Sequence, residues 1–305
     1  MPRVRSTSEK ITIGIIGGSG LYDMEGLTDI TSVCMSTPFG KPSDEYIIGT
    51  LFGKRVAFLP RHGRGHRIMP TDINYRANIY GMKKLGVEQI ISVSAVGSMK
   101  EKIKPGDIVI PDQFYDHTKH RVSTFFGKGI VAHVGTADPV CPRLSAVLIA
   151  AGVETGATIH RGGTYLCMEG PQFSTRAESM VYRSWGVDVI GMTNATEAKL
   201  SREAELCYNT IALATDYDCW HQSEESVTVE AVLAVMKKNI ETSKAMIREA
   251  VRFLPEHRSC LCGEALKNTI MTPANQIPAH IKKDLALIIG KYIPHASRQS
   301  SARKR

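Results

Sequence analysis

The sequence lacks the features that mark membrane-spanning and secreted proteins. None of its apolar runs approaches the roughly 18 residues that a membrane span needs. The first residues, Met1 to Ser6, do not contain the apolar core of a signal peptide. The 7 cysteines are an odd number scattered over 305 residues, which is not the pattern of a secreted disulfide framework. We therefore expect a cytoplasmic protein with no membrane association.

Two glycine-rich nucleotide motifs are also absent. The segment Gly14 to Gly20 does not have the G-x-G-x-x-G spacing of a dinucleotide site, and no G-x-x-x-x-G-K-[ST] occurs. These absences exclude a Rossmann cofactor and most nucleoside-triphosphate chemistry. What remains is a tight turn, Gly17 to Gly20, which can present backbone N–H groups and the Ser19 hydroxyl to an anion. A glycine turn needed only for chain reversal is the alternative.

A metal-binding pattern is at most weakly present. Cys260-Leu261-Cys262 with His257 nearby offers three potential ligands, which is a weak zinc signal. A strained or local disulfide is favoured over a metal, chiefly for a thermophilic host, but the sequence leaves the state of the two cysteines open. We predict no metal site.

The formal charge of +8 does not indicate a nucleic-acid partner, because much of it lies at the two ends of the chain. The sequence contains no basic run interleaved with aromatic residues and no known nucleic-acid-binding motif. We predict an N-terminal tail over residues 1–10, one domain over residues 11–290, and a basic C-terminal tail over residues 291–305.

Apolar segments of strand length alternate with amphipathic segments of helix length, which indicates an α/β fold with a largely parallel sheet. The predicted strands are Ile11 to Ile16, Val56 to Leu59, Gln89 to Val93, Asp107 to Ile110, Val187 to Met192 and Thr210 to Thr215. The predicted helices are Asn74 to Leu85, Arg143 to Ala151, Thr175 to Trp185, Glu197 to Leu206 and Thr228 to Leu254.

Polar residues follow five of these strands, where open parallel sheets bind ligands. Arg61 and His62 offer donors suited to a phosphate, although they could also belong to a solvated basic loop. Hydroxyl groups from three other strand ends could complete an anion site: Ser19, Ser94 and Thr193. Asp216 and Asp218 could accept a hydrogen bond from an amino group or carry a proton to a ring nitrogen. Ordinary loop acids that cap the next helix are the alternative for this pair.

These segments carry a family resemblance. The runs I-G-I-I-G-G-S-G from Ile13, P-R-H-G from Pro60, S-A-V-G-S from Ser94 and M-E-G-P-Q-F-S-T-R-A-E-S from Met168 resemble purine nucleoside phosphorylases of the trimeric type. The hexapeptide T-D-Y-D-C-W from Thr215 resembles their 5′-methylthioadenosine phosphorylase branch. The similarity extends from about residue 11 to about residue 253.

The resemblance implies a single-domain phosphorylase fold, a twisted mixed sheet flanked by helices, with no metal or organic cofactor and with orthophosphate as co-substrate. It implies a homo-oligomer, either a trimer or a dimer of trimers, that acts on a nucleoside. The phosphate ligands that it implies are Ser19, Arg61, His62, Ser94, Ala95 and Thr193. The residues that it places around the nucleoside are Phe173, Ser174, Met192, Asp216, Tyr217 and Asp218. The implied residues of the 5′-methylthio pocket are Val229, Val232 and Leu233, together with His133 from a neighbouring subunit.

The resemblance implies phosphorolysis, in which Asp216 protonates N7 of the purine and phosphate attacks the sugar. One residue departs from the family, since Gly191 stands where an Asn often precedes the Met-Thr pair. Other functions are a broader purine nucleoside phosphorylase that accepts adenosine or 6-oxopurine nucleosides, a hydrolase, and a catalytically silent binding protein. The predicted anion site argues against hydrolysis, because water as nucleophile needs no phosphate site.

Overall fold

The computed structural model describes residues 10–18, 20–21, 23–221, 229–255 and 257–293, but not the side chains of residues 229–234 and 236. The strands are β1 (Ile11–Gly17), β2 (Thr28–Val33), β3 (Tyr46–Leu51), β4 (Lys54–Pro60), β5 (Gln89–Ser98), β6 (Ile108–Ile110), β7 (Gln113–His117), β8 (Ile159–Arg161), β9 (Thr164–Met168), β10 (Val189–Gly191) and β11 (Cys207–Asp216). The α-helices are α1 (Tyr75–Leu85), α2 (Pro142–Glu154), α3 (Arg176–Ser184), α4 (Asn194–Glu203), α5 (Val229–Phe253), α6 (Ala279–Asp284) and α7 (Ala286–Ile289), with 3₁₀ turns η2 (Asp218–Trp220) and η3 (Leu261–Glu264).

The strands form one mixed sheet that branches at β5. Its main path runs β2-β3-β4-β1-β5-β10-β9-β7, while β11 pairs with β5 and leads to β6 and β8. The neighbours β4, β1, β5 and β11 are parallel to one another, whereas β10 runs antiparallel to the far half of β5. The predicted mixed sheet flanked by helices is therefore confirmed.

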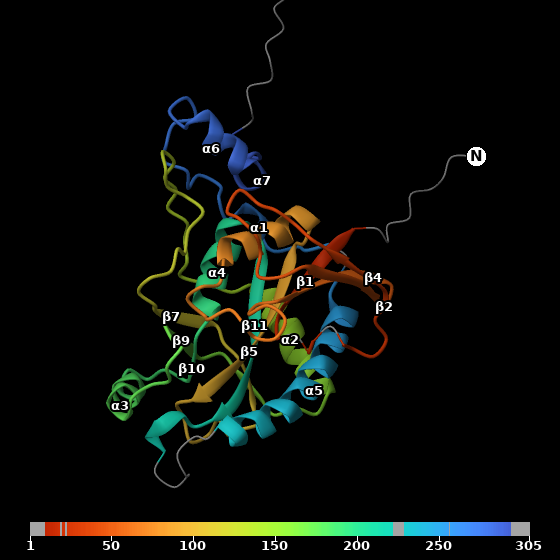
Figure 1. Ribbon diagram of the computed structural model, residues 1–305, viewed down its shortest axis with the longest axis vertical. Helices are drawn as coiled ribbons and strands as arrows, with labels where there is room; N and C mark the ends of the chain where they lie inside the picture. The colour runs from red at the N-terminus through yellow and green to blue at the C-terminus, as the bar shows by residue number, and fades with distance from the viewer. Residues whose placement is uncertain (1–9, 19, 22, 222–228, 256, 294–305) are drawn as a thin grey trace, which may run out of the picture.

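Helices cover both faces of the sheet, and alternation along the strands decides which side chains meet them. Ile13 and Ile15 of β1 share a buried cluster with α2 and α5, while Ile16 belongs to a second cluster with α1 and α4. Figure 1 shows α2 and α5 together on one side and α1 and α4 on the other. The two apolar layers fix the central strands rigidly, so residues at the strand ends are held in place.

Local signals in the sequence account for several helix ends. The side chain of Asn74 caps α1 by accepting a hydrogen bond from Ala77 N at 3.1 Å, and Gly86 ends the helix in the left-handed region at φ 96°. Thr175 and Glu178 form a reciprocal capping box at the start of α3.

The structure also corrects the predictions in places. Strands β2, β3, β7, β8 and β9 were not predicted, and β5 continues to Ser98 instead of ending at Val93. The C-terminal tail cannot begin at residue 291, because Ile293 is buried and the Tyr292 hydroxyl donates to Glu205 Oε1 at 2.5 Å. Within the described residues, no helix is both long and apolar enough to cross a membrane.

Glu203 in α4 is a partly buried carboxyl whose charge state should affect stability. It accepts hydrogen bonds from the Thr124 hydroxyl and the Phe125 N–H, both at 2.7 Å. Burial nevertheless raises the pKa of Glu203 to about 7, and these hydrogen bonds only partly oppose the rise. The folded protein therefore holds the proton more tightly than the unfolded chain does.

We predict that Glu203 stabilises the fold below its unfolded pKa of 4.5 and loses this contribution as the pH rises towards 7. The loss should amount to roughly 3 kcal/mol between pH 4.5 and 8. Glu203→Gln keeps an acceptor oxygen but does not titrate, so its stability should depend less on pH. Urea unfolding of both proteins across this range measures the difference. Parallel pH profiles would contradict the prediction.

Candidate active site

The register of the sheet brings the predicted site residues to one region. Arg61 follows β4 and donates its backbone N–H to Gly17 at the end of β1, at 2.9 Å. Ser94 and Ala95 lie within β5, not after it as predicted, and pair with residues of β11. Ala95 is exposed although β5 is a central strand, so the sheet is uncovered at this point. Asp216 ends β11 beside Gly97 of β5.

Beneath this region, Arg61 is held in a buried ion pair that sequence reasoning missed. Its guanidinium is 3% exposed and binds both carboxylate oxygens of Glu197 in α4, whose side chain is 1% exposed. Arg61 also donates to Val93 O at 3.0 Å and to Ser92 Oγ at 2.5 Å. Glu197 in turn accepts from the hydroxyls of Ser92 and Tyr208, both at 2.9 Å. The polar atoms of the pair are therefore well supplied with partners.

This arrangement corrects the predicted role of Arg61 as a fork on phosphate. Its Nε and Nη2 atoms, which would form the fork, face the carboxylate of Glu197 instead. Burial acts to lower the pKa of Arg61, but the adjacent Glu197 charge outweighs it and raises the pKa above its ordinary value. Arg61 therefore keeps a permanent positive charge under the predicted anion site and helps to fix the backbone around it.

His62 is neutral in this structure. Its Nδ1 atom lies 2.8 Å from Ile68 O, and because a carbonyl only accepts, the proton must be on Nδ1. Burial, followed by the Arg61 charge, lowers the pKa of His62 to about 4. Nε2 then carries a lone pair, so the predicted donation from the ring to phosphate would require a second proton. A bound phosphate dianion would favour that protonation.

Ser94 lies next to a tyrosine that the sequence alone did not reveal. The buried Tyr165 of β9 places its hydroxyl 3.3 Å from Ser94 Oγ. The same hydroxyl occupies the space beside Gly191, since a Cβ atom there would lie 2.0 Å from it. The family Asn cannot be accommodated at 191 while Tyr165 takes this position. Tyr165 therefore fills the space that a side chain at residue 191 would need.

Thr193 and Met192 are positioned by the loop after β10, and Arg121 holds that loop. Thr193 is buried at the start of α4. The Arg121 side chain donates to Met192 O, to Glu169 O at 2.5 Å and to the Tyr75 hydroxyl at 3.1 Å. Met192 is only partly buried, which leaves part of its side chain available to a ligand.

Glu169, which directly follows β9, connects the end of that strand to two other loops through its carboxylate. Its carboxylate accepts from Thr71 Oγ1 at 2.5 Å, from His120 N at 3.1 Å and from Lys119 N. Burial would raise the pKa of Glu169, but the hydrogen bonds from Thr71 and the two backbone N–H groups lower it to about 2. Glu169 is therefore ionised at neutral pH and fixes the segment that follows β9.

The two carboxyls after β11 have different surroundings. Asp216 Oδ1 accepts from Asp218 N and Oδ2 accepts from the Thr215 hydroxyl, both at 2.7 Å. Asp218 adopts φ 52°, and its buried Oδ2 atom has no hydrogen-bond partner among the described residues. Burial raises the pKa of Asp218, while the nearby hydroxyls of Ser179 and Ser174 oppose the rise. The two carboxyls thus differ: both oxygens of Asp216 accept hydrogen bonds, whereas burial favours the protonated form of Asp218.

Gly97 supplies the room that this pair needs. A Cβ atom at residue 97 would lie 3.0 Å from Asp216 Oδ1 and 3.3 Å from Asp218 Cβ. Both carboxyls therefore sit directly over the backbone of β5 because residue 97 has no side chain.

Three further residues predicted to surround the nucleoside differ in exposure and in contacts. Phe173 is 67% exposed, and Ser174, which follows it, accepts a hydrogen bond from Cys219 Sγ on its backbone oxygen at 3.3 Å. The side chain of Tyr217 is buried and stacks on His221, with ring centroids 4.6 Å apart. A substrate contact from residue 217 would therefore have to come from its backbone.

Other predicted residues lie outside this region or outside the described residues. His133 is exposed, and its N–H donates to Thr269 O at 2.9 Å, so its loop pairs with the C-terminal segment rather than with the strand ends. Ser19 and the side chains of Val229, Val232 and Leu233 lie outside the described part of the structure. Their roles, like those of the other site residues, stay predictions.

The fold agrees with comparisons to known proteins. Residues 12–252 match the profile of the phosphorylase superfamily. The chain belongs to this superfamily.

Its relatives include S-methyl-5′-thioadenosine phosphorylases. The one from Geobacter sulfurreducens is 64% identical over 92% of this chain and 99% of its own length. The one from Thermofilum pendens is 50% identical over 86% of this chain and its entire length.

Solved structures agree with these relatives. A methylthioadenosine phosphorylase from an Antarctic soil metagenomic library has a TM-score of 0.88 and 49% identity, covering 92% of this chain and 99% of its own. The methylthioadenosine phosphorylase of Schistosoma mansoni, in complex with adenine, has a TM-score of 0.76 and 34% identity, covering 92% of this chain and 98% of its own.

The ion pair leads to a prediction about stability. Arg61→Ala should destabilise the protein by about 3–5 kcal/mol, because it leaves the Glu197 carboxylate buried without a counter-charge. The double variant Arg61→Met, Glu197→Leu should recover much of this loss, since no unpaired charge remains. Urea unfolding of the three proteins measures the effect. An unchanged unfolding midpoint in Arg61→Ala would show that the pair contributes little.

Proposed function

We propose that this chain catalyses the phosphorolysis of S-methyl-5′-thioadenosine to adenine and 5-methylthioribose 1-phosphate. The observation that carries the proposal is the meeting of two kinds of site at one region of the sheet. Predicted phosphate-binding residues follow β4 and lie within β5, and a carboxyl pair ends the adjacent strand β11. The relatives that bear this name align over most of the chain.

Phosphate would bind above Arg61, whose charge is offset by the Glu197 carboxylate, so the contacts to the ion come from other residues. Ser94 and Thr193 supply hydroxyls, and the exposed backbone at Ala95 lets the ion approach the central strand. The bound dianion attacks C1 of the sugar as the bond to the purine breaks. It also stabilises the positive charge that develops on the sugar in the transition state.

The carboxyl pair would bind the purine and protonate it as it leaves. Each oxygen of Asp216 accepts a hydrogen bond within the protein, and a carboxyl oxygen can also take part in a bond to the adenine edge. The donors from Thr215 and Asp218 stabilise the carboxylate that remains once a proton has moved to N7. Adenine then leaves as a neutral base instead of an anion.

Phosphate should be required for turnover. Release of adenine from S-methyl-5′-thioadenosine should fall to background in phosphate-free buffer and return when phosphate is added. Chromatography of adenine and of the sugar product measures both sides of the reaction. Equal rates with and without phosphate would identify a hydrolase and refute the proposal.

Asp216→Asn should lower kcat/KM for S-methyl-5′-thioadenosine by about a hundred-fold or more, because an amide cannot supply a proton. It should also improve inosine relative to adenosine, since the amide can donate to a 6-oxo group. Asp218→Asn is the matched comparison, because it keeps the backbone N–H that binds Asp216. If Asp218→Asn loses the rate while Asp216→Asn keeps it, the two carboxyls have the opposite roles.

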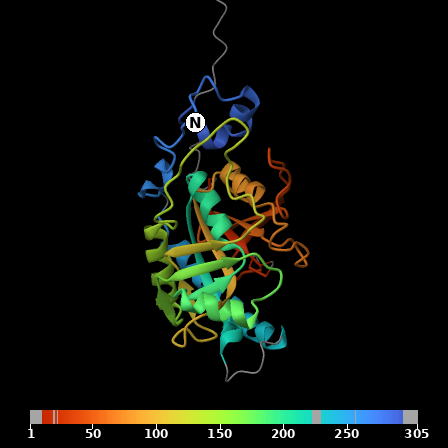
Figure 2. The same ribbon diagram turned by 90° about the vertical axis from the view of Figure 1, so that its left-hand side faces the viewer.

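We also infer that the chain forms a homo-oligomer. Five large apolar side chains are between 46% and 67% exposed on α3, on the segment before it and on β7: Tyr115, Phe173, Met180, Val181 and Trp185. Figure 2 shows the molecule with the side that carries α3 and β7 towards the viewer. Two of these side chains are in contact, since the ring centroids of Tyr115 and Trp185 are 5.4 Å apart. An exposed apolar patch of this kind is typical of an interface.

Light scattering tests the oligomer. We expect a mass of three or six chains, and Trp185→Glu should dissociate the assembly because it places a charge in the patch. A fully active monomer would contradict the inference. The cytoplasmic location and the absence of a nucleic-acid partner stay predictions.

A further inference from the structure

Four cysteines that are distant in sequence meet at the end of β11 opposite to the carboxyl pair. Cys207 begins β11, Cys141 precedes the first turn of α2, and Cys260 and Cys262 belong to the segment after α5. Their sulfur atoms all lie within 4.8 Å of one another. Because β11 is ten residues long, the cluster is about 30 Å from Asp216. The cysteine cluster therefore plays no part in the proposed reaction.

We propose that the cysteine cluster is a structural zinc site of the tetrathiolate type. Zinc bound by four thiolates has Zn–S distances of about 2.3 Å, which places the sulfurs about 3.8 Å apart at the corners of a tetrahedron. The sulfurs of Cys207 and Cys260 are 3.2 Å apart, and the largest separation within the cluster is 4.8 Å. The observed separations bracket the tetrahedral value, so small side-chain movements suffice to bind the ion.

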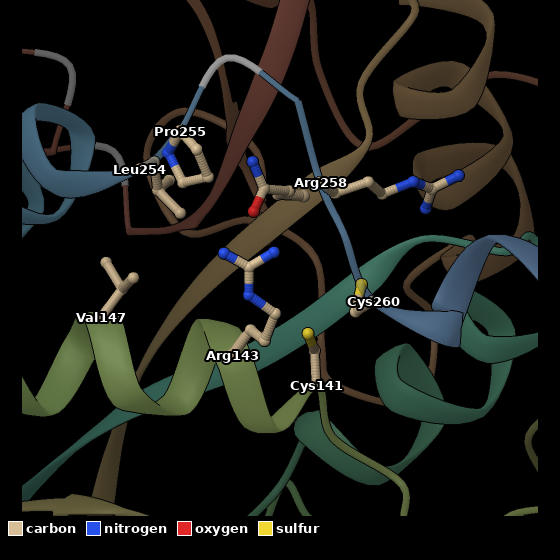
Figure 3. Close-up of a pocket in the computed structure, with 8 residues that line it drawn as sticks. Cys141, Arg143, Val147, Leu254, Pro255, Arg258 and Cys260 are labelled. Atoms are coloured by element: carbon tan, nitrogen blue, oxygen red, sulfur yellow. The ribbon is translucent and has the colours of Figure 1, made fainter.

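The surroundings suit thiolates and a negatively charged metal centre. Cys141 lies at the N-terminus of the 13-residue helix α2, where the helix dipole favours a negative charge. Zn²⁺ with four thiolates has a net charge of −2, and two arginines, Arg143 and Arg258, line a cavity of about 10 Å³ beside the cluster. Figure 3 shows these arginines with Cys141 and Cys260.

The burial of the cluster indicates a structural and not a catalytic metal. Cys141, Cys207 and Cys262 are buried, and only Cys260 is partly exposed. Four protein ligands leave no open position for water or substrate, which is the arrangement of structural zinc sites. The ion would tie the C-terminal segment to β11 and α2. The prediction of no metal considered only Cys260, Cys262 and His257 as ligands. In the structure His257 is exposed, and the cluster instead contains Cys141 and Cys207.

The test is the zinc content of the full-length protein, purified without oxygen and without chelators. Wild type should contain about one zinc per chain by elemental analysis. Cys34→Ser is the matched control, because Cys34 is an exposed thiol outside the cluster. This variant should keep the metal, whereas Cys260→Ser should bind zinc at least a hundred-fold more weakly, going by the roughly 10- to 100-fold loss seen when even an outer partner is removed. Circular dichroism checks that each variant folds.

Cobalt gives a second readout that does not need a variant. Co²⁺ in the emptied wild-type site should show sulfur-to-metal charge-transfer bands and the visible bands of tetrahedral coordination. Removing the metal should lower the Tm by at least about 5 °C and leave adenine release at 25 °C unchanged. Because the readouts are metal content and stability, they do not depend on the proposed reaction.

Several results would overturn the zinc site. Failure of the folded, reduced wild-type protein to take up zinc or cobalt would refute it. So would a Cys260→Ser variant that binds zinc as tightly as wild type. Four thiols joined as two disulfides in freshly isolated protein, or iron with inorganic sulfide in place of zinc, would also refute it. If both Cys260→Ser and Cys262→Ser fail to fold, the zinc content and the cobalt spectrum of wild type decide alone.

Discussion

The buried ion pair between Arg61 and Glu197 is the constraint on which the rest of the site depends. Removing both charges from water is costly, and the cost is offset only because the pair is also hydrogen-bonded by Ser92, Val93 and Tyr208. These partners come from the end of β4, from β5, from α4 and from β11. One interaction thus fixes the positions of four elements under the proposed phosphate site. Because the two charges offset each other, the main effect of the pair on the site is to hold these elements in place.

The two ends of β11 belong to two different sites. Its last residue belongs to the carboxyl pair, and its first residue belongs to the cysteine cluster. Between them the strand is fully buried and parallel to β5. A metal at the start of the strand would stabilise the C-terminal segment without entering the chemistry at the other end. Stability and reaction could therefore be changed independently by mutation.

Much of the fold was predictable from local patterns. The buried strands β1, β4 and β11 are nearly uniform apolar runs, and α5 has a regular 3.6-residue period, so each was found within a few residues. β2 and β7 were missed because they are largely exposed edge strands with mixed polar sequences. The placement of Ser94 after a strand was wrong, because β5 continues through the site and pairs there with the antiparallel β10.

The sequence by itself determined the family, the strand ends that carry polar residues, and the carboxyl pair at Asp216 and Asp218, because these are encoded in short contiguous motifs. Only the tertiary structure decided what those residues contact. Arg61 and Glu197 are 136 positions apart, and their pairing depends on the order of strands in the sheet. The same holds for Tyr165 beside Gly191 and for the meeting of Cys141, Cys207, Cys260 and Cys262. No local pattern specifies such contacts, because packing of the whole sheet and its helices sets the distances between distant residues.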